Sequence, residues 1–456
     1  MGRRRPTRIS LIAAALLIAA LGVRVAEVEL TSYSPRNDAG SYLTLASQIA
    51  HTGDYSTSRR AGGGAGGTLG PSAYFPPAFP YLLAAVDLIG GNTGRRGSSI
   101  HPGRLSQAVI GTATVAFVGL VAFELFDATV ALIALGLAAF YPVFVELSAA
   151  LVAENLMTLL ILAAVWMALS GRRSEHPYRW IAAAGVLTGL ATLTHVNSLV
   201  MIVPLALAAW HARRGWRAPA LLVVAALLTV TPWLVRNGVV MHRFIFITDE
   251  AGITLRGTYN SASAANRPVA YKWRIFYGIP GERPLIAREG RLTEPELSSR
   301  LESQALHYIA DHPLSPFEVA YHNSLRLLEL EGESAWRASA QAQSLPRGIA
   351  DTGVICFWIM GVLALAGAFT HRVRAAPPWV WAVPLLLWLT VVLVNAETPR
   401  FREPIDAFLI LSAACALATA PAALRRRLHR PPVGRQRGAA VPAVPGQLVE
   451  MVERLA

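Results

Sequence analysis

Two acidic residues stand beside apolar runs, where a carboxylate could act on a hydroxyl group. Asp38 lies in RNDAGSYLTLASQIAHTGDYS, after the first apolar run, and Glu154 lies in ELSAALVAENLM, at the start of a later one. A carboxylate held beside a hydroxyl can accept its proton as a general base. Helix capping is the alternative for both residues, because acidic side chains also occur at helix starts. Glu146 is a weaker candidate of the same kind.

Four arginines lie at the ends of apolar runs, where they could bind an anion: Arg104, Arg236, Arg400 and Arg402. Guanidinium groups bind phosphate oxygens through paired hydrogen bonds, so a lipid phosphate is a suitable ligand. The alternative is that these side chains pair with lipid headgroups or with Glu397 and Glu403.

His195 and Asn197 lie between two short apolar runs, where a histidine is more often an interfacial residue than a ligand. The sequence has no HExxH, no CxxC and no Asp-rich cluster, so a tightly held metal is not predicted. A loosely held divalent cation on Asp38 and Glu154 is left open as a cofactor.

The composition indicates that lipid surrounds most of the chain. Of 456 residues, 54% are hydrophobic and only 15% are charged, a balance that a water-soluble domain of this size could not carry. The net charge of +13 comes from short Arg clusters between apolar runs, which favour contact with membrane lipids over nucleic acid. Cys356 and Cys415 lie inside apolar stretches, so we interpret them as core residues.

The apolar runs predict an all-α, polytopic membrane protein with about ten transmembrane helices. The expected crossings are residues 9–27, 105–125, 129–146, 154–170, 180–195, 197–211, 218–235, 351–370, 379–394 and 405–424. The first run could be a signal peptide, but no convincing cleavage site follows Leu21, which favours an uncleaved helix. Tyr74 to Gly91 contains three prolines and Asp87, so we expect an interfacial helix there and not a crossing.

Positive charge predicts the orientation, since Arg-rich connections resist translocation. Both termini are then cytoplasmic, and the expected location is the plasma membrane. The inner connections carry Arg172, Arg173, Arg179, Arg213, Arg214, Arg217, Arg372 and Arg374, and the inner tail adds Arg425, Arg426, Arg427 and Arg430.

This topology divides the chain into four predicted parts. Residues 1–235 form a transmembrane catalytic module whose outer loop is 28–103, residues 236–350 form a second outer loop or cap, residues 351–424 form the last helices, and residues 425–456 form a disordered basic tail. The Gly-rich run Ala61 to Gly70 lacks the residues of a P-loop and predicts a hinge. Thr293 and Glu296 predict a capping box that opens a helix toward Ala310, and a second helix is expected from Pro316 to Leu330.

The order of these landmarks resembles the GT-C polyprenyl-phosphate-sugar-dependent glycosyltransferases, in particular the group of protein O-mannosyltransferases and lipid A aminoarabinose transferases (glycosyltransferase family 39-like). The resemblance covers residues of about 30 to 425. It is carried by Asp38 with Tyr42, YFPPAFPYLLA, Arg104, Glu154, GVLTGLATLTHVNSL, TPWLVRN and PRFREPIDAFLI.

The resemblance implies an enzyme that transfers a hexose or pentose from a polyprenyl-phosphate donor to a hydroxyl of an extracytoplasmic protein, lipid or glycan, with inversion. It implies that Asp38 is the base and that Glu154 positions donor, acceptor or ion. Arg104, Arg236, Arg400 and Arg402 would bind the donor phosphate. The expected substrate-binding residues are Tyr42, Tyr74, His195, Asn197 and Asn237.

Two other functions remain open at this point. A transporter or flippase of an anionic lipid would also suit many helices and outward arginines, although it predicts internal repeats and polar groups in mid-membrane. The sequence shows no convincing repeat, and its charged residues are expected at helix ends. A non-catalytic membrane subunit would tolerate replacement of Asp38 and Glu154.

Overall fold

The computed structural model describes residues 8–57, 70–90, 100–213, 215–286, 291–342, 347–396 and 400–428, and it is almost entirely helical in these ranges. The strands found there are the two short antiparallel strands β1 (Ser56–Thr57) and β2 (Gly70–Pro71), with Ser56 opposite Pro71. The predicted hinge, apart from Gly70, and residues 429–456 of the predicted tail lie outside the described residues, whereas residues 425–428 of that tail are helical and end α20 (Glu403–Leu428). One compact unit ends at Ala418 and a second begins at Thr419.

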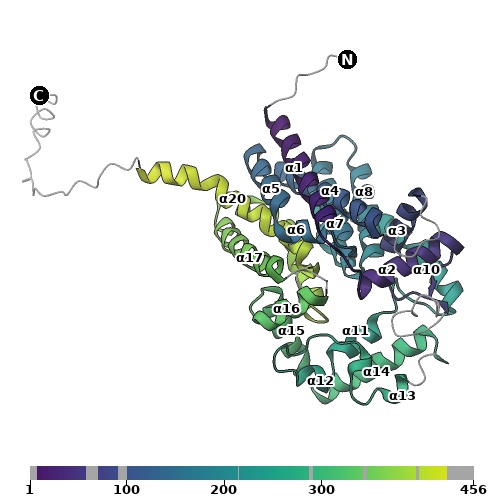
Figure 1. The fold of residues 1–456 in the computed structure, drawn as a ribbon. Coiled ribbons are helices and arrows are strands. Elements are labelled where there is room, and N and C mark those ends of the chain that lie inside the picture. The colour runs from purple at the N-terminus through teal and green to yellow at the C-terminus, as the bar shows by residue number, and fades with distance from the viewer. Residues whose placement is uncertain are drawn as a thin grey trace, which may run out of the picture. The chain divides into compact units, whose positions relative to one another are not determined.

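A bundle of long apolar helices forms the centre of the first unit. Its helices are α1 (Arg8–Leu30), α4 (Ile100–Leu125), α5 (Ala128–Phe140), α7 (Ala153–Ser170), α8 (Pro177–Thr194) and α10 (Arg217–Met241). Helices α4, α7, α8 and α10 pack against one another in that order (Figure 1). Gly185 and Gly189 allow α8 to lie against α10, because a Cβ atom at Gly185 would stand 2.8 Å from the Ala225 Cβ and overlap Leu222 O.

Every segment predicted to cross the membrane is helical, and six of the described helices are long and apolar enough to span a bilayer. The segment 129–146 is not one helix, because it breaks at Tyr141 into α5 and α6 (Pro142–Leu147). Pro142 begins α6, a position where its missing N–H costs no hydrogen bond. The segment 197–211 starts as the 3₁₀ helix η3 (Val196–Met201) and continues as α9 (Ile202–Arg213).

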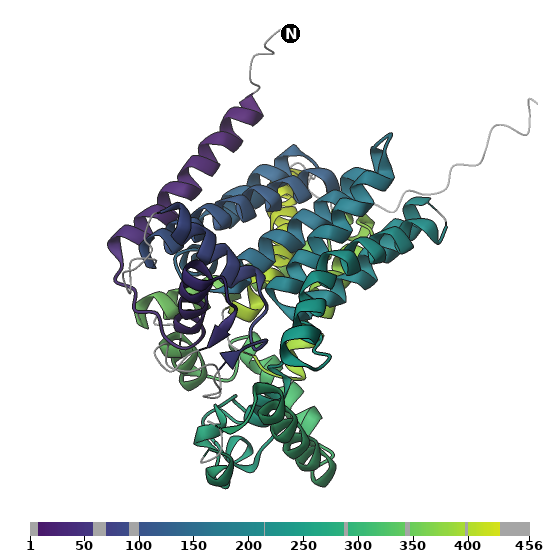
Figure 2. The ribbon, with the colours of Figure 1, turned by 90° about the vertical axis from the view of Figure 1, so that its right-hand side faces the viewer.

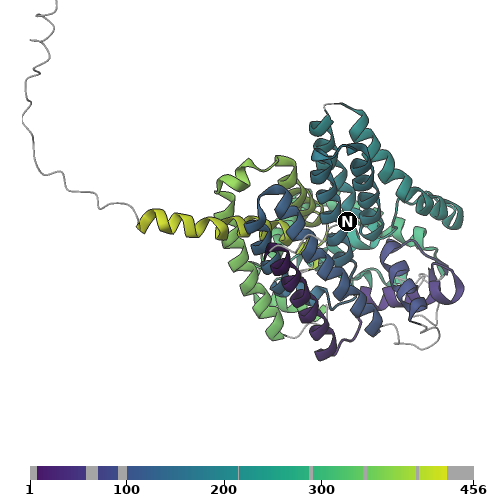
Figure 3. The same cartoon turned by 90° about the horizontal axis from the view of Figure 1, so that it is seen from above.

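The C-terminal helices of this unit pack beside the bundle. They are α17 (Arg347–Ala368), α18 (His371–Ala375), α19 (Pro378–Val392), η6 (Arg400–Arg402) and the part of α20 (Glu403–Leu428) up to Ala418. In the bundle itself, a 3₁₀ turn η2 (Gly171–Arg173) links α7 to α8. Viewed from above, the green helices of this part lie on one side and the blue and teal helices of the bundle on the other (Figure 3). Helix α19 contacts η3 and α9, which joins the two sides.

The two long connections fold into small helices. The first contains α2 (Asp38–Thr52) and the short α3 (Ala78–Ile89), which pack together. The second contains α11 (Ala251–Thr258), α12 (Ser261–Ala264), η4 (Phe276–Gly278), α13 (Arg283–Ile286), α14 (Glu294–Asp311), α15 (Ser315–Leu327) and α16 (Glu333–Ala342). These helices lie at the end of the bundle away from the start of α1 (Figure 2). The predicted capping box is confirmed, since Glu296 Oε2 accepts a hydrogen bond from the Thr293 N–H at 2.9 Å.

A charged side chain is also buried inside the bundle. Arg24 of α1 is fully buried and donates hydrogen bonds to Ser148 Oγ at 3.1 Å and Ala139 O at 3.0 Å. The absence of a side chain at Gly111 leaves the room that this contact needs. These carbonyl oxygens belong to the last turn of α5, which ends before α6 begins. They accept the hydrogen bonds of Arg24 and so compensate for its burial.

Candidate functional site

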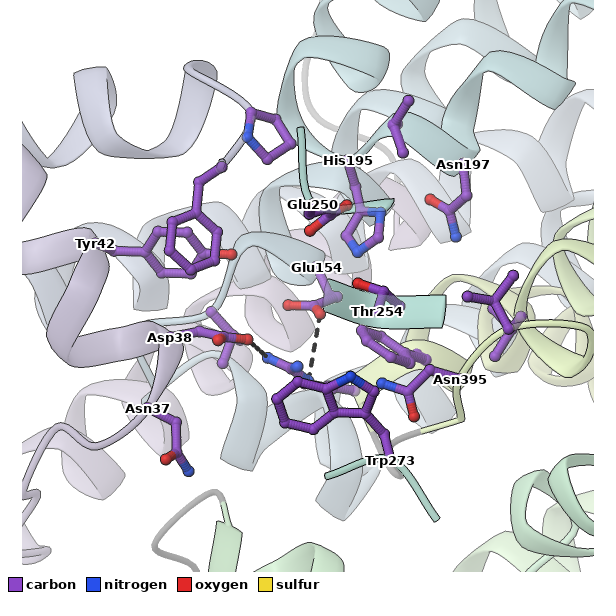
Figure 4. Close-up of a pocket in the computed structure, with 18 of the residues that line it drawn as sticks. Asn37, Asp38, Tyr42, Glu154, His195, Asn197, Glu250, Thr254, Trp273 and Asn395 are labelled. Atoms are coloured by element: carbon purple, nitrogen blue, oxygen red, sulfur yellow. Dashed lines mark hydrogen bonds and ion pairs between the residues drawn. The ribbon is translucent and has the colours of Figure 1, made fainter. Parts of the chain in front are cut away.

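A cavity of about 380 Å³ lies where both long connections meet the ends of the helices (Figure 4). Its walls come from the start of α2, the segment before α3, the start of α7, the turn before η3, α11, the end of α19 and η6. The residues that line the cavity include Asp38, Tyr42, Tyr74, Phe75, Glu154, His195, Asn197, Glu250, Thr254, Lys272, Trp273, Asn395, Arg400 and Phe401.

Asp38 is the first residue of α2, and it faces the cavity. The residue at the N-cap position is Asn37, which has a positive φ of 51°. Asp38 Oδ2 accepts a hydrogen bond from Arg400 Nη1 at 2.7 Å, and its side chain remains 35% exposed. The carboxylate is therefore both paired with a cation and accessible from the cavity. Its place in the first helical turn also puts negative charge at the positive end of the helix dipole.

Glu154 lies at the second position of α7 and is held close to the same guanidinium. Its Oε1 atom is 3.5 Å from Arg400 Nε, and the side chain is only 3% exposed. Among the residues that the structure describes, no donor is within hydrogen-bond distance of Glu154 Oε2. A buried acceptor without a donor is costly unless a ligand or water supplies one. Glu154 is thus a polar group with capacity for a ligand.

The turn that precedes α7 is fixed by a polar network that sets where Glu154 points. Gln107 donates hydrogen bonds from Nε2 to Val152 O at 2.6 Å and Ala150 O at 3.1 Å. Asn155 Nδ2 in turn donates to Gln107 O at 3.0 Å. Because these side chains are buried in the bundle, the first turn of α7 is held by α4 and is well positioned for chemistry.

Arg400 connects the two acids and is the cation at the centre of the site. Its guanidinium carbon lies 4.6 Å from the centre of the Phe401 ring, a cation–π contact that fixes the planar group. The His195 ring packs edge to face with the Phe401 ring, and the two ring centres are 5.7 Å apart. Glu397, the alternative partner for Arg400 and the other three arginines, lies outside the described residues.

An aromatic wall borders the carboxylates. The ring centres of Tyr42 and Phe75 are 4.7 Å apart, and those of Tyr74 and Phe75 are also 4.7 Å apart. Burial raises the pKa of Tyr42 and Tyr74 well above the usual value, and the nearby charges of Asp38 and Glu250 add to the effect. Both hydroxyls therefore stay protonated at neutral pH and can act as hydrogen-bond donors.

The structure does not bring Arg104 or Arg236 to the cavity. Arg104 donates hydrogen bonds to Ala149 O at 2.6 Å and Val28 O at 2.8 Å. Arg236 donates to Ser72 O at 2.6 Å and to the carbonyl of Tyr55 at 2.7 Å. Each guanidinium thus fastens a loop backbone, and neither lines the cavity in this structure.

Arg402 and Asn237 are also occupied elsewhere. Arg402 is 1% exposed, lies 2.9 Å from Glu329 Oε1 and 3.1 Å from Asp406 Oδ1, and is not among the described residues that line the cavity. Its partners are therefore Glu329 and Asp406, and not Glu403 as the sequence suggested. Asn237 Nδ2 reaches the carbonyls of Ile245 and Ile247 at 3.3 Å each, which ties the end of α10 to the following loop.

Several lining residues were not predicted from the sequence. Glu250, Thr254, Lys272 and Trp273 come from the second long connection, and Asn395 follows α19. Burial, with a further contribution from the negative charge of Asp38, raises the pKa of Glu250 to about 8. No local sequence pattern around Glu250, in ITDEAGIT, predicts its role. Only the folding of the loop over the helix ends brings Glu250 to the site.

The described residues contain no group of three or more His, Cys, Asp and Glu side chains that could hold a metal ion. Between Asp38 and Glu154 the positive charge is supplied by Arg400. The arrangement can therefore bind an anion at the guanidinium and accept a proton at the carboxylates.

The chain is similar to known proteins in part of its sequence and in its fold. Residues 75–235 match the family model described as dolichyl-phosphate-mannose-protein mannosyltransferase. No curated protein sequence matches the chain. The oligosaccharyltransferase of Archaeoglobus fulgidus tethered with an acceptor peptide has a TM-score of 0.52 at 14% identity, with 94% of this chain and 52% of that chain covered.

Two further solved structures are similar to this chain. The archaeal oligosaccharyltransferase AglB from A. fulgidus was solved with an inhibitory peptide and a dolichol-phosphate. It has a TM-score of 0.50 at 15% identity, and the alignment covers 97% of this chain and 54% of the AglB chain. ArnT from Cupriavidus metallidurans, bound to undecaprenyl phosphate, has a TM-score of 0.43 at 16% identity, with 93% and 81% covered. The chain spans about half the length of the archaeal oligosaccharyltransferases. It has the GT-C fold of membrane glycosyltransferases, and its residues 75–235 match the dolichyl-phosphate-mannose-protein mannosyltransferase family.

Proposed function

We propose that the protein is a membrane glycosyltransferase that moves a sugar from a polyprenyl-phosphate donor to a hydroxyl group outside the cytoplasm. The observation that carries the proposal is the cluster of Asp38, Arg400 and Glu154 on one cavity of a GT-C fold. The fold is shared with an oligosaccharyltransferase that was solved with a dolichol-phosphate, which supports a lipid-phosphate carrier.

Asp38 is the proposed base. As the acceptor oxygen forms its bond to the anomeric carbon of the sugar, the acceptor proton passes to the Asp38 carboxylate, and the bond from that carbon to the phosphate oxygen breaks. The electron pair leaves with the polyprenyl phosphate, which is already a good leaving group and needs no strong general acid. Attack from the face opposite the phosphate inverts the anomeric carbon.

Arg400 is the proposed phosphate ligand. Its guanidinium also donates a hydrogen bond to Asp38 at 2.7 Å, so a phosphate bound by Arg400 would lie close to the proposed base. Lys272 also lines the cavity and supplies a second positive charge for the phosphate. Arg104, Arg236 and Arg402 then stabilise the surrounding backbone.

Glu154 positions Arg400 in this proposal. Its side chain is buried beside the guanidinium Nε, so it fixes the orientation in which the other nitrogens face the cavity. The Arg-rich connections support an orientation with the cavity on the outer side of the plasma membrane and both termini in the cytoplasm. An acceptor protein, lipid or glycan would reach the cavity from there.

Mass spectrometry of cell-envelope glycans and lipids, in cells with and without the protein, tests this function. Loss of the protein should remove one sugar from an envelope glycan or glycoprotein and should cause one polyprenyl-phosphate-linked sugar to accumulate. Re-expression of the wild-type chain should reverse both changes, and the Asp38→Asn chain should reverse neither. An unchanged set of glycans and lipid-linked sugars would contradict the proposal.

A further inference from the structure

The second outer connection presents a second set of side chains to the cavity, beyond the proposed base and phosphate ligand. Glu250 directly precedes α11, and Thr254 follows one helical turn later. The Thr254 N–H donates a hydrogen bond to Glu250 O at 2.9 Å, so the spacing is helical and both side chains lie on one face. Both line the cavity that contains Asp38 and Glu154 (Figure 4).

The start of α11 is held rigidly against α14. Ser298 Oγ donates a hydrogen bond to Asp249 O at 2.8 Å and accepts one from the Gly252 N–H at 3.3 Å. The two helices are so close at this point that a Cβ atom at Gly252 would overlap the Ser298 backbone. Side chains on rigid, closely packed elements are placed more accurately than side chains on free loops, as a specific ligand site requires.

Trp273 adds an aromatic surface to the same wall. Its indole N–H donates to Ile253 O at 3.4 Å, and Gly257 provides the space against which the ring packs, since a Cβ there would overlap the indole. With its one donor turned to α11, the ring offers carbon and π surface to a cavity ligand. The C–H face of a sugar ring is a ligand surface that suits an aromatic ring.

Some of the buried acceptors that line this cavity await hydrogen-bond donors. Among the residues described by the structure, Glu154 Oε2 and Asn395 Oδ1 have no hydrogen-bond partner, and Glu154 is only 2% exposed as a whole residue. Hydroxyl groups on a bound ring would supply the missing donors. The chemistry of the wall therefore fits a polyhydroxylated ring better than a polyprenyl chain.

We propose that Glu250, Thr254 and Trp273 form the subsite for the sugar ring of the lipid-linked donor, in which the Glu250 carboxyl group donates a hydrogen bond to a sugar hydroxyl. This inference rests on the proposed function and specifies where its sugar binds. At pH 7 the raised pKa of about 8 keeps the Glu250 carboxyl group protonated, as a donor must be. The titratable and charged groups that line this cavity with it are Asp38, Tyr42, Tyr74, Glu154, His195, Lys272 and Arg400.

Equilibrium binding to the purified full-length protein tests the subsite without any acceptor. The probes are polyprenyl phosphate alone and polyprenyl phosphates that carry mannose, glucose or arabinose. The wild-type protein should bind one of the sugar-linked lipids more tightly than the bare carrier. Glu250→Ala should reduce this preference roughly tenfold, the effect of one well-placed hydrogen bond, and leave binding of the bare carrier unchanged. Trp273→Ala should reduce the preference as well.

The Glu250→Gln variant distinguishes a hydrogen-bond donor from a base. Its amide still donates, so the preference for the sugar-linked lipid should persist. The wild-type preference should fall as the pH rises through about 8, because the carboxyl group loses its proton there, whereas the Glu250→Gln preference should stay constant. Glu302→Ala, at an exposed acid of α14, is the control and should bind both lipids as the wild type does.

Each outcome separates the subsite from the function on which it rests. If the wild-type protein binds neither bare nor sugar-linked lipid, the proposed function itself fails. If the wild type binds the lipids without a preference for sugar, or if Glu250→Ala weakens both lipids equally, the subsite is overturned while the transferase proposal stands. Thermal melting of each variant without lipid identifies a variant that has merely lost its fold, and Glu250→Gln then decides the question.

Discussion

Replacement of Arg400 by glutamine should destabilise the protein because it leaves a buried carboxylate without its cation. Arg400 contacts two acids of different exposure: the Asp38 side chain is 35% exposed and that of Glu154 is 3% exposed. A partly exposed ion pair contributes about 1 kcal/mol or less. A buried acid that loses its only counter-charge costs about 3–5 kcal/mol. The loss should therefore arise mainly from Glu154.

This reasoning predicts a specific rescue. Glu154→Gln in the Arg400→Gln background removes the unpaired charge and should restore most of the lost stability, whereas Asp38→Asn in the same background should restore little. Thermal unfolding of the purified variants in one detergent measures the effect, and the midpoint of Arg400→Gln should fall by roughly 5 °C. Sugar transfer should be lost in all of these variants, since none keeps both the cation and the base.

Two results would refute the reasoning that Arg400 stabilises the protein mainly through Glu154. Arg400→Gln could unfold at the wild-type temperature, which would mean that the guanidinium does not compensate the Glu154 charge. Alternatively, Asp38→Asn could restore stability as well as Glu154→Gln does, which would mean that burial does not separate the two acids. In either case the geometry of the site would need to be reassigned.

Two pairs of glycine variants test how the site is positioned. Gly252→Ala should push α11 away from α14 at a cost of about 1–3 kcal/mol and should reduce transfer, because Glu250 moves with α11. Gly278→Ala, in open space within the same long connection, should match the wild type in both assays. Gly111→Ala should displace the Arg24 contact with Ser148 and lower the melting temperature, whereas Gly136→Ala should not. Equal effects within either pair, measured by thermal unfolding and by transfer assays, would show that close packing at these glycines is unimportant.

The sequence predicted the helical architecture well because the signal for a membrane helix is local. Long apolar runs and their flanking arginines identify segments without knowledge of their neighbours. The short helix α3 was also expected, because three prolines and Asp87 leave too little apolar length. The break at Pro142 was missed, since the apolar run around it is continuous in composition.

The acids of the site were recognisable for a similar reason, and most of the cations were not. Asp38 and Glu154 stand at helix starts beside apolar residues, where a carboxylate is costly to place without a partner or a function. Both line the cavity. Arg104 and Arg236 have the same kind of sequence context as Arg400, yet they bind carbonyl oxygens. Which acceptor a guanidinium reaches depends on backbone far away in the sequence, and no local pattern encodes it.

The contribution of the second long connection to the site could not be predicted at all. Glu250 and Trp273 reach the cavity because α11 packs on α14, through contacts between residues that are many positions apart. The buried Arg24 was missed for the same reason. Its burial is compensated by carbonyls of α5 and a serine after α6, which only the folded chain brings to it.

Sugar transfer by the wild-type and Asp38→Asn proteins in proteoliposomes, from a labelled polyprenyl-phosphate-linked sugar that the wild type binds, tests the central claim most directly. Loss of the base should slow transfer by about 10²- to 10⁴-fold. Donor binding and the melting temperature should change little, because the Asp38 ion pair is partly exposed. Transfer at the wild-type rate by a folded Asp38→Asn protein would contradict the account.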